Sequence, residues 1–261
     1  MNFTTKTNKQ IDALFHPDSI AIVGLPREMK TGKLYLIALQ DQGFSGKIVG
    51  VNPKADVIDG IKCYPSVASI PGKVDLAIVL TPYNHTLPVI EECAQKGVKG
   101  VVLFTAGYKE TGTVEGAQRQ AKIVDVAKKA GMRLIGPNGM GLYAPESGLS
   151  FFPKLSRQSG PISLISHSGS LANIICAVGA AKGLFFNKAV SLGNECDLTS
   201  VDFFNFYAED PNTSIISAYI EGIADGVSFI KAIRNAALKK PVIIWKVGLK
   251  PEGLSRANSH T

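Results

Sequence analysis

The sequence lacks the features that mark a secreted, disulfide-bonded or membrane-spanning protein. Its 261 residues include only four cysteines, which are widely spaced and form no CxxC pair: Cys63, Cys93, Cys176 and Cys196. Neither a disulfide framework nor a zinc site is therefore indicated. No apolar run approaches the roughly 18 residues that a membrane-spanning helix needs, and the first segment, MNFTTKTNKQ, is too polar for a signal peptide. We expect a cytoplasmic protein that binds no metal and no membrane.

Signals for nucleic-acid binding are also missing. The net charge is +7 at pH 7, but the lysines are scattered rather than gathered in a basic helix or beside exposed aromatic residues. We therefore expect no nucleic-acid partner. A polyanionic small molecule would need only a few cations at the ends of strands, so the positions of the lysines decide between partners.

What is present is a regular alternation of strands and helices. Short apolar runs, rich in β-branched residues, are typical of a parallel sheet covered on both faces. In the first half we predict strands over 19–24, 47–52, 74–82, 100–105 and 132–138, and helices over 32–43, 85–96 and 115–130. After a Pro- and Gly-containing loop we predict strands over 161–169, 188–193, 213–222 and 241–248, and helices over 170–182, 201–210 and 226–239. This alternation predicts two α/β units with doubly wound sheets.

The turn after the first predicted strand has the properties of a phosphate site. Gly24 ends the strand and Gly32 lies near the start of the next helix, whose free N–H groups and dipole favour an anion. The dinucleotide signature GxGxxG is absent, since the turn reads GLPREMKTGK. Three cations surround this turn: Arg27, Lys30 and Lys33.

The end of the second predicted strand narrows the choice of nucleotide. An NAD enzyme places an acidic residue there, on the ribose hydroxyls, whereas the segment VNPK ends in Lys54. A lysine favours a ribose that carries a phosphate group, and both NADP and coenzyme A have one. The residues alone leave these two ligands open, although neither half of the chain offers a recognisable site for hydride transfer.

Several segments together resemble a known family. IAIVGLP, GKIVGVNPK, KCYPSVASIP, VDLAIVLTP, FTAGYKETG and IGPNGMGLYAP closely resemble the CoA-binding domain of the NDP-forming acyl-CoA synthetases, a group that includes ADP-forming acetyl-CoA synthetase and the alpha subunit of succinyl-CoA synthetase. The resemblance implies a Rossmann-like CoA-binding domain over residues 1–147 and a flavodoxin-like, succinyl-CoA-ligase-like parallel α/β domain over residues 158–261. Because a domain of this kind normally adds a helix after its last strand, we expect the second domain to be incomplete.

The resemblance also implies which residues contact coenzyme A. Those expected to line the CoA groove, with the cations of the first turn, are Gly24, Pro26, Arg27, Lys30, Lys33, Asn52, Pro53, Lys54, Thr81, Pro82, Thr105 and Ala106. Asn138 and Gly139 are expected near the thiol end. The family usually has Gly-Ala-Ser after the first strand, whereas this chain has Leu25 and Pro26 after the glycine. The serine hydroxyl is missing, so backbone amides would have to replace it.

The segment SHSGSLA, in the second unit, predicts an anion pocket at a helix N-terminus. Four residues are expected to bind phosphate: Ser166, Ser168, Gly169 and Ser170. The segment superficially resembles the nucleophile elbow GxSxG of serine hydrolases, but a serine replaces its first glycine and only one histidine follows. In the family, SQSG or SRSG opens a helix whose N-terminus holds the phosphate of a phosphohistidine. His167 replaces the usual Gln or Arg, and we assign it no catalytic role.

Two residues are assigned catalytic roles by the same resemblance. The segment GLSRANSHT, which contains His260, resembles the phosphohistidine loop of the family. Neutral imidazole is nucleophilic near pH 7 and forms an N–P bond that can be passed on. Glu221, in AYIEGIADG, matches the glutamate that orients the histidine ring and supports its positive charge.

The implied reaction interconverts acyl-CoA, phosphate and NDP with acid, CoA and NTP, through an acyl phosphate and a phosphohistidine. No ATP-grasp domain is recognisable in the chain, so we expect Mg-ATP or Mg-ADP to bind only in a missing domain or a beta subunit. The expected partners are coenzyme A, a small carboxylic acid and that domain or subunit, and we expect an oligomer. The alternative is a regulatory CoA-binding module related to acyltransferase-linked homologues. An NADP oxidoreductase remains a third reading.

Overall fold

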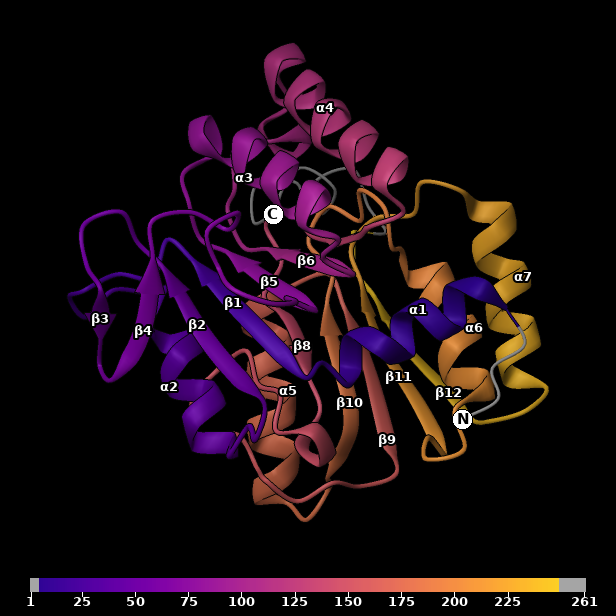
Figure 1. The fold of residues 1–261 in the computed structure, drawn as a ribbon. Coiled ribbons are helices and arrows are strands. Elements are labelled where there is room, and N and C mark those ends of the chain that lie inside the picture. The colour runs from indigo at the N-terminus through magenta and orange to yellow at the C-terminus, as the bar shows by residue number, and fades with distance from the viewer. Residues whose placement is uncertain (1–4, 249–261) are drawn as a thin grey trace.

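The computed structural model describes residues 5–248, which form two α/β units with one sheet each (Figure 1). The first sheet has seven strands in the order β3-β4-β2-β1-β5-β6-β7, all parallel except β3. Its strands are β1 (Ser19–Val23), β2 (Lys47–Val51), β3 (Val57–Ile58), β4 (Ile61–Tyr64), β5 (Leu76–Val79), β6 (Gly100–Leu103) and β7 (Arg133–Ile135).

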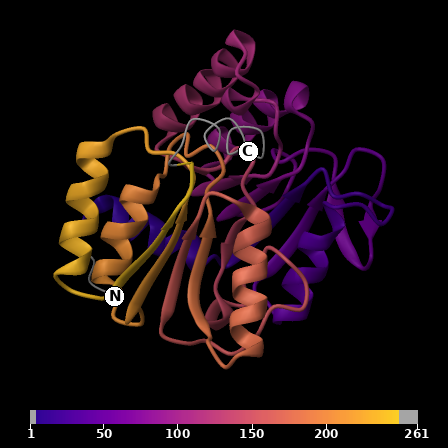
Figure 2. The ribbon, with the colours of Figure 1, turned by 180° about the vertical axis from the view of Figure 1, so that it is seen from behind.

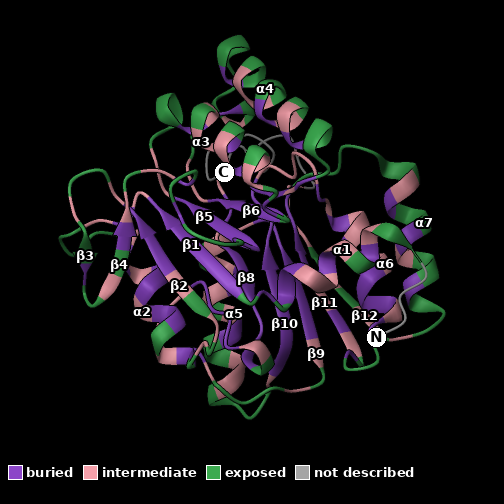
Figure 3. Cartoon of the chain, in the orientation of Figure 1, coloured by how far each residue is buried: buried purple, intermediate pink, exposed green. Residues whose placement is uncertain are grey.

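The first sheet is buried on both faces, as the continuous apolar runs predict. All residues of β1 and β5 are buried (Figure 3). Neighbouring residues of β1 point into different cores: Ile20 packs with the residues of α2 (Lys33–Gln42), whereas Ala21 packs with those of α3 (Tyr83–Lys96) and α4 (Val114–Ala130). The prediction of a doubly wound sheet is therefore confirmed.

The second sheet has five strands in the order β12-β11-β9-β10-β8, and only β8 runs antiparallel to its neighbour. Its strands are β8 (Gly141–Tyr143), β9 (Ile162–Ser166), β10 (Phe186–Ser191), β11 (Ile215–Ile220) and β12 (Val242–Lys246). Helices α6 (Ser200–Glu209) and α7 (Gly226–Ala237) cover one face, and α5 (Gly169–Ala181) lies on the other (Figure 2). The parallel strands have the flavodoxin-like order 2-1-3-4. Two short 3₁₀ helices complete the structure, Lys109–Thr111 and Pro145–Ser147.

Several elements differ from the sequence-based prediction, which did not include the antiparallel pair of β3 and β4. Helix α1 (Lys6–Phe15) was not predicted, because its apolar face consists mainly of Ile11, Leu14 and Phe15 in a polar segment. Phe15 stacks on Phe206 of α6 with 5.9 Å between ring centroids, so helix α1 packs on the second unit. Strand β8 was not predicted either, and its residues, which we placed in the first domain (1–147), pair with β10 of the second sheet. Its three residues are too short a run to reveal which sheet they join.

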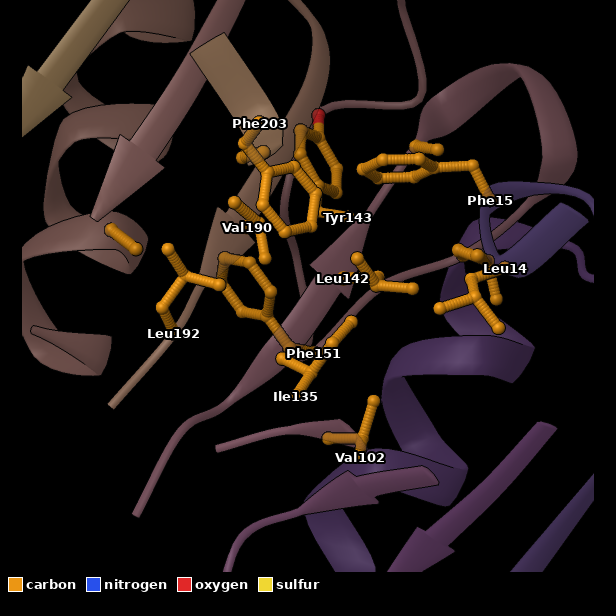
Figure 4. Close-up of a cluster of buried hydrophobic side chains, with 14 of the residues drawn as sticks. Leu14, Phe15, Val102, Ile135, Leu142, Tyr143, Phe151, Val190, Leu192 and Phe203 are labelled. Atoms are coloured by element: carbon orange, nitrogen blue, oxygen red, sulfur yellow. The ribbon is translucent and has the colours of Figure 1, made fainter. Parts of the chain in front are cut away.

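The two sheets share one hydrophobic core. Val102 and Ile135 of the first sheet lie in the same buried cluster as Leu142, Phe151 and Val190 of the second unit (Figure 4). A polar contact joins the units as well: the Arg133 guanidinium binds both carboxylate oxygens of Asp197, at 2.8 and 3.2 Å. Bidentate pairs of this kind fix geometry. The relative position of the two sheets, and of the loops at their carboxyl ends, is therefore set by packing.

Candidate active site at the carboxyl ends of two sheets

The first sheet reverses its winding direction at β1, which lies between β2 and β5. Ligands of such sheets bind at the carboxyl ends of the strands on either side of this point. Gly24, directly after β1, has φ +84° and lies so near Thr81 that an added Cβ would be 3.2 Å from its side chain. The loops after β1 and β5 are thus packed together at the predicted CoA groove.

Asn52 connects the ends of β1 and β2. Its Nδ2 donates to the carbonyl of Leu25 at 2.9 Å, and its Oδ1 accepts from the backbone N–H of Lys54 at 2.8 Å. Asn52 therefore fixes the turn at Leu25 and Pro26, where the family usually has a serine, and also the backbone that carries Lys54. The side chains of Pro53 and Lys54 are exposed at this edge, where an incoming phosphate could reach the ammonium group.

The cations of the first turn are not equivalent. Lys33 is buried, donates from Nζ to the carbonyl of Arg27 at 2.6 Å, and forms an ion pair with Asp59 at 2.9 Å. Its ammonium group thus already links the β1–α2 loop to the turn between β3 and β4. Arg27 and Lys30 are exposed, and Lys30 lies 3.7 Å from the exposed Glu28. An exposed ion pair contributes little to stability, so Glu28 does not hold Lys30 away from a ligand. Of the predicted cations, Arg27, Lys30 and Lys54 are therefore accessible to a ligand.

The remaining residues predicted for the CoA groove follow β5 and β6, and those predicted near the thiol end follow β7. Thr105 Oγ1 donates to the carbonyl of Thr81 at 2.6 Å, and the N–H of Asn138 donates to the carbonyl of Thr105 at 3.1 Å. Pro82 and Ala106 are exposed on the same side. The structure thus brings the predicted residues of three consecutive strand ends together.

The loops of the two sheets interlock at this point. The N–H of Asn194, after β10, donates to the carbonyl of Pro137 at 2.9 Å. A Cβ at Gly139 would lie 2.8 Å from the carbonyl oxygen of Ser191, and a Cβ at Gly169 would lie 2.5 Å from the side chain of Met140. The turn containing Asn138 and Gly139 therefore lies directly beside the first residue of α5, where the phosphate pocket is predicted.

We expect a Gly193→Ala substitution to destabilise the protein at this interlock. Gly193 has φ +55°, and an added Cβ would overlap the carbonyl oxygen of Pro137. The left-handed backbone alone costs about 1–2 kcal/mol for a non-glycine residue, and overpacking adds about 1–3 kcal/mol. Urea denaturation measures the loss. Gly183→Ala is the matched control, since Gly183 has φ +78° but open space around the Cβ position; equal losses in the two variants would contradict the proposed clash.

The predicted phosphate pocket is the N-terminus of α5. Ser168 is the N-cap and its Oγ accepts from the N–H of Leu171 at 3.3 Å. The N–H groups of Gly169 and Ser170 belong to the first turn, which no helical carbonyl can satisfy, and the helix dipole adds positive potential there. The buried Ser166 donates from Oγ to the carbonyl of Ser168 at 2.7 Å and so fixes the turn. An anion fits this arrangement.

Glu221 lies beside this pocket, at the end of β11, the strand next to β9. Its side chain is buried, and Lys246 of β12 donates from Nζ to its backbone carbonyl at 2.9 Å. Burial raises the pKa of Tyr219, and the charge of Glu221 and a hydrogen bond to it raise this pKa further. The predicted orienting carboxylate and the predicted phosphate pocket are therefore neighbours. His260 lies outside the described residues.

Two residues of this region have contacts that the sequence did not reveal. The buried imidazole of His167, to which we assigned no role, contacts Glu195 and the backbone of Glu221. Glu195 was not singled out at all, although its positive φ of 52° is unusual for a non-glycine residue. The only signal in the sequence is its place in the segment SLGNE (191–195), at the end of a predicted strand.

The described part of the chain shows neither a metal-binding cluster nor a membrane-spanning helix. Residues 5–248 contain no group of three or more His, Cys, Asp or Glu side chains arranged to hold a metal ion. Over the same residues, no helix combines the length and the apolar character required to cross a bilayer.

Comparison with known proteins assigns both halves of the chain. The family model described as "CoA binding domain" matches residues 18–145. The model described as "Succinyl-CoA ligase like flavodoxin domain" matches residues 159–261.

Individual relatives agree with these family models. The chain is 38% identical over 253 residues to acetate–CoA ligase (ADP-forming) I of Archaeoglobus fulgidus, covering 96% of this chain and 36% of that protein. It is 37% identical over 251 residues to the alpha subunit of acetate–CoA ligase (ADP-forming) II of Pyrococcus furiosus, covering 96% and 55%. The structure of acetyl-coenzyme A synthetase 1 of Ca. Korarchaeum cryptofilum, in complex with phosphate and ADP, matches with a TM-score of 0.88 and 38% identity, covering 96% and 54%. This chain thus spans about a third to about half of the length of these relatives.

Proposed function

Because this chain belongs to the family of NDP-forming acyl-CoA synthetases, we propose that it forms the CoA- and phosphate-binding part of an acid–CoA ligase. The complete enzyme would interconvert acyl-CoA, phosphate and ADP or GDP with a small carboxylic acid, CoA and the nucleoside triphosphate. The nucleotide, with Mg²⁺, would bind an ATP-grasp domain or a beta subunit, in an oligomer that works in the cytoplasm.

The observation that carries this proposal is the contact between the two predicted sites. Met140, which follows the turn of Asn138 and Gly139 at the predicted thiol end, packs its side chain against Gly169 at the start of α5. The backbone nitrogen of the buried Glu221 lies 3.2 Å from His167, just before the same helix. A reaction in which phosphate attacks a thioester needs these two reactants within a few ångströms of each other. A CoA-binding regulator has no need for an anion pocket at this position.

The described residues would bind the two reactants, CoA and phosphate, at separate sites. Backbone amides after β1 and the exposed cations Arg27, Lys30 and Lys54 bind the phosphates of CoA. The N–H groups of Gly169 and Ser170 bind phosphate beside the thioester and stabilise the oxygens that gain charge.

The phosphoryl group then moves to a histidine. Attack of phosphate on the thioester carbonyl releases the CoA thiolate and leaves an acyl phosphate. His260 takes the phosphoryl group from it and releases the carboxylic acid, while Glu221 orients the imidazole and balances its positive charge. Transfer to the nucleoside diphosphate completes the reaction.

Binding measurements on the complete protein test the CoA site. We expect Lys54→Ala to weaken CoA binding about 10- to 100-fold, because a hydrogen bond between charged groups contributes about 1.5–3 kcal/mol. Isothermal titration calorimetry with CoA and with dephospho-CoA, which lacks the 3′-phosphate, measures the loss. The wild type should prefer CoA over dephospho-CoA, and this preference should disappear in the variant.

Lys73→Ala is the matched control for this experiment. Lys73 is also exposed but precedes β5, at the opposite edge of the same sheet, so its loss should leave CoA binding unchanged. Equal weakening by both substitutions would mean that only the net charge matters. Tighter binding of NADP than of CoA would contradict the ligase proposal and favour an oxidoreductase.

A further inference from the structure

His167 makes contacts through both ring nitrogens at the end of β9. Nδ1 lies 3.2 Å from the backbone nitrogen of Glu221 and 3.5 Å from that of Gly222, and Nε2 lies 3.0 Å from Oε1 of Glu195. Backbone N–H groups can only donate, so Nδ1 must be the acceptor and the ring hydrogen must be on Nε2, where it is donated to the carboxylate. The neutral Nε2–H tautomer is the form that satisfies all three contacts.

Glu195 is itself held in place. The same Oε1 accepts from the N–H of Ser200 at 2.6 Å, at the N-terminus of α6, where the helix dipole favours a negative charge. Glu195 also keeps a left-handed backbone, which costs free energy in a non-glycine residue and is typical of functional sites. A chain of contacts therefore runs from α6 through Glu195 and His167 to the end of β11.

The Glu221 residue is fixed from two sides by this arrangement. Its N–H is bound by His167, and its carbonyl oxygen accepts from Lys246 at 2.9 Å. The backbone of a residue sets where its side chain begins, so these contacts determine the direction from which the Glu221 carboxylate approaches its neighbours. His167 also directly precedes Ser168, the N-cap of α5. It therefore connects the residue that carries the Glu221 carboxylate to the predicted phosphate pocket.

His167 is unsuited to carry a phosphoryl group. Only 6% of the residue is exposed, and both ring nitrogens have protein partners. A phosphoryl group on Nε2 would displace the Glu195 carboxylate, and one on Nδ1 would displace two backbone amides. The ring can orient other groups but is not available as a nucleophile.

We propose that His167 and Glu195 form a positioning pair that fixes the Glu221 carboxylate against the phosphate pocket for phosphoryl transfer. This role rests on the proposed function, because it concerns the transfer step of that reaction. The pair should affect the rate of the transfer and not the affinity for CoA, whose predicted groove lies on the first sheet.

The experiment uses the complete enzyme, with acetyl-CoA as the probe thioester, inorganic phosphate and ADP, and measures ATP formation. We expect His167→Leu to lower kcat about 10- to 100-fold, the loss that a misplaced catalytic group produces, with an unchanged Kd for CoA. His167→Gln has both an acceptor and a donor and should recover most of the activity. Glu195→Ala should reproduce the effect of His167→Leu.

The double variant separates a working pair from two independent residues. In His167→Leu/Glu195→Ala the loss of kcat should be no larger than in either single variant, because both substitutions break one chain of contacts. The pair would be overturned if the two single-variant losses of kcat multiply in the double variant. It would also be overturned if kcat of His167→Leu stays within threefold of the wild type, or if kcat and CoA affinity fall in parallel. If His167→Leu does not fold, Glu195→Ala alone decides by the same criteria.

The two proposals fail in different ways. A wild-type enzyme that binds CoA but forms no ATP from any acyl-CoA tested overturns the proposed function, and the positioning role with it. An active wild type with fully active Glu195→Ala and His167→Leu variants overturns the positioning role alone.

Discussion

Replacing Asp210 by asparagine should lower the free energy of unfolding by about 3–5 kcal/mol, the usual cost of removing one partner of a buried ion pair. Asp210 is 0% exposed and accepts from Nζ of Lys188, 1% exposed, at 2.8 Å. In the variant, the Lys188 ammonium remains buried without its counter-charge. Urea denaturation followed by circular dichroism measures the loss.

An exposed pair supplies the control for this prediction. Asp125 and Lys129 lie 2.7 Å apart, but their side chains are 59% and 76% exposed, so Asp125→Asn should cost about 0.5 kcal/mol or less. A similar loss in both variants would show that the buried pair contributes nothing beyond ordinary surface electrostatics.

The pair also predicts how stability depends on pH. Burial raises the pKa of Asp210, but the hydrogen bond and charge of Lys188, with help from Thr213, outweigh it, and the net pKa is lowered. A carboxyl with a lowered folded-state pKa stabilises the protein above its unfolded value, near 4, and this stabilisation is lost as the pH falls through the folded value. Asp210→Asn should therefore flatten the acid side of the stability profile measured below pH 4.

The sheet and helix order was predictable because local patterns determine it. β1 and β5 are continuous apolar runs between turn residues, and α4 ends at Gly131 with a left-handed φ of 68°, which is a common helix stop. The position of β8 was not predictable, since three residues carry no pattern that distinguishes one sheet from the other. Its pairing with β10 is decided by tertiary packing.

The positions of the candidate site residues were predictable only where they depend on a local segment. The serines at the start of α5 and Lys54 at the end of β2 follow from strand–turn–helix order. The burial of Lys33 was not predictable, because its ion-pair partner Asp59 lies in a distant hairpin. The same holds for His167, whose carboxylate partner is 28 residues further along the chain. Long-range polar pairs leave no periodic signal in a single sequence.

In the complete enzyme, His260→Ala is expected to abolish the labelling of the protein by ATP or acetyl phosphate carrying labelled phosphate. Removing a covalent nucleophile costs on the order of 10³-fold or more in turnover, and His260 is the proposed acceptor of the phosphoryl group. The label on the wild type should be acid-labile and base-stable, as an N–P bond requires. Glu221→Gln retains His260, the acceptor, but should slow its labelling by about 10²- to 10⁴-fold, because the amide cannot balance the positive charge of the imidazolium.

His85→Ala is the matched control, because His85 is exposed at the first turn of α3 and has no role in the proposed transfer. Its label should equal that of the wild type, and CoA binding should be unchanged in all three variants. CoA binding without any label in the wild type would favour the regulatory module, since such a protein has the first site and not the relay. Full labelling of His260→Ala would assign the phosphoryl group to another residue. The proposed roles of the buried Glu221 and His167 at the α5 pocket would then be wrong, because both depend on His260 as the phosphoryl acceptor.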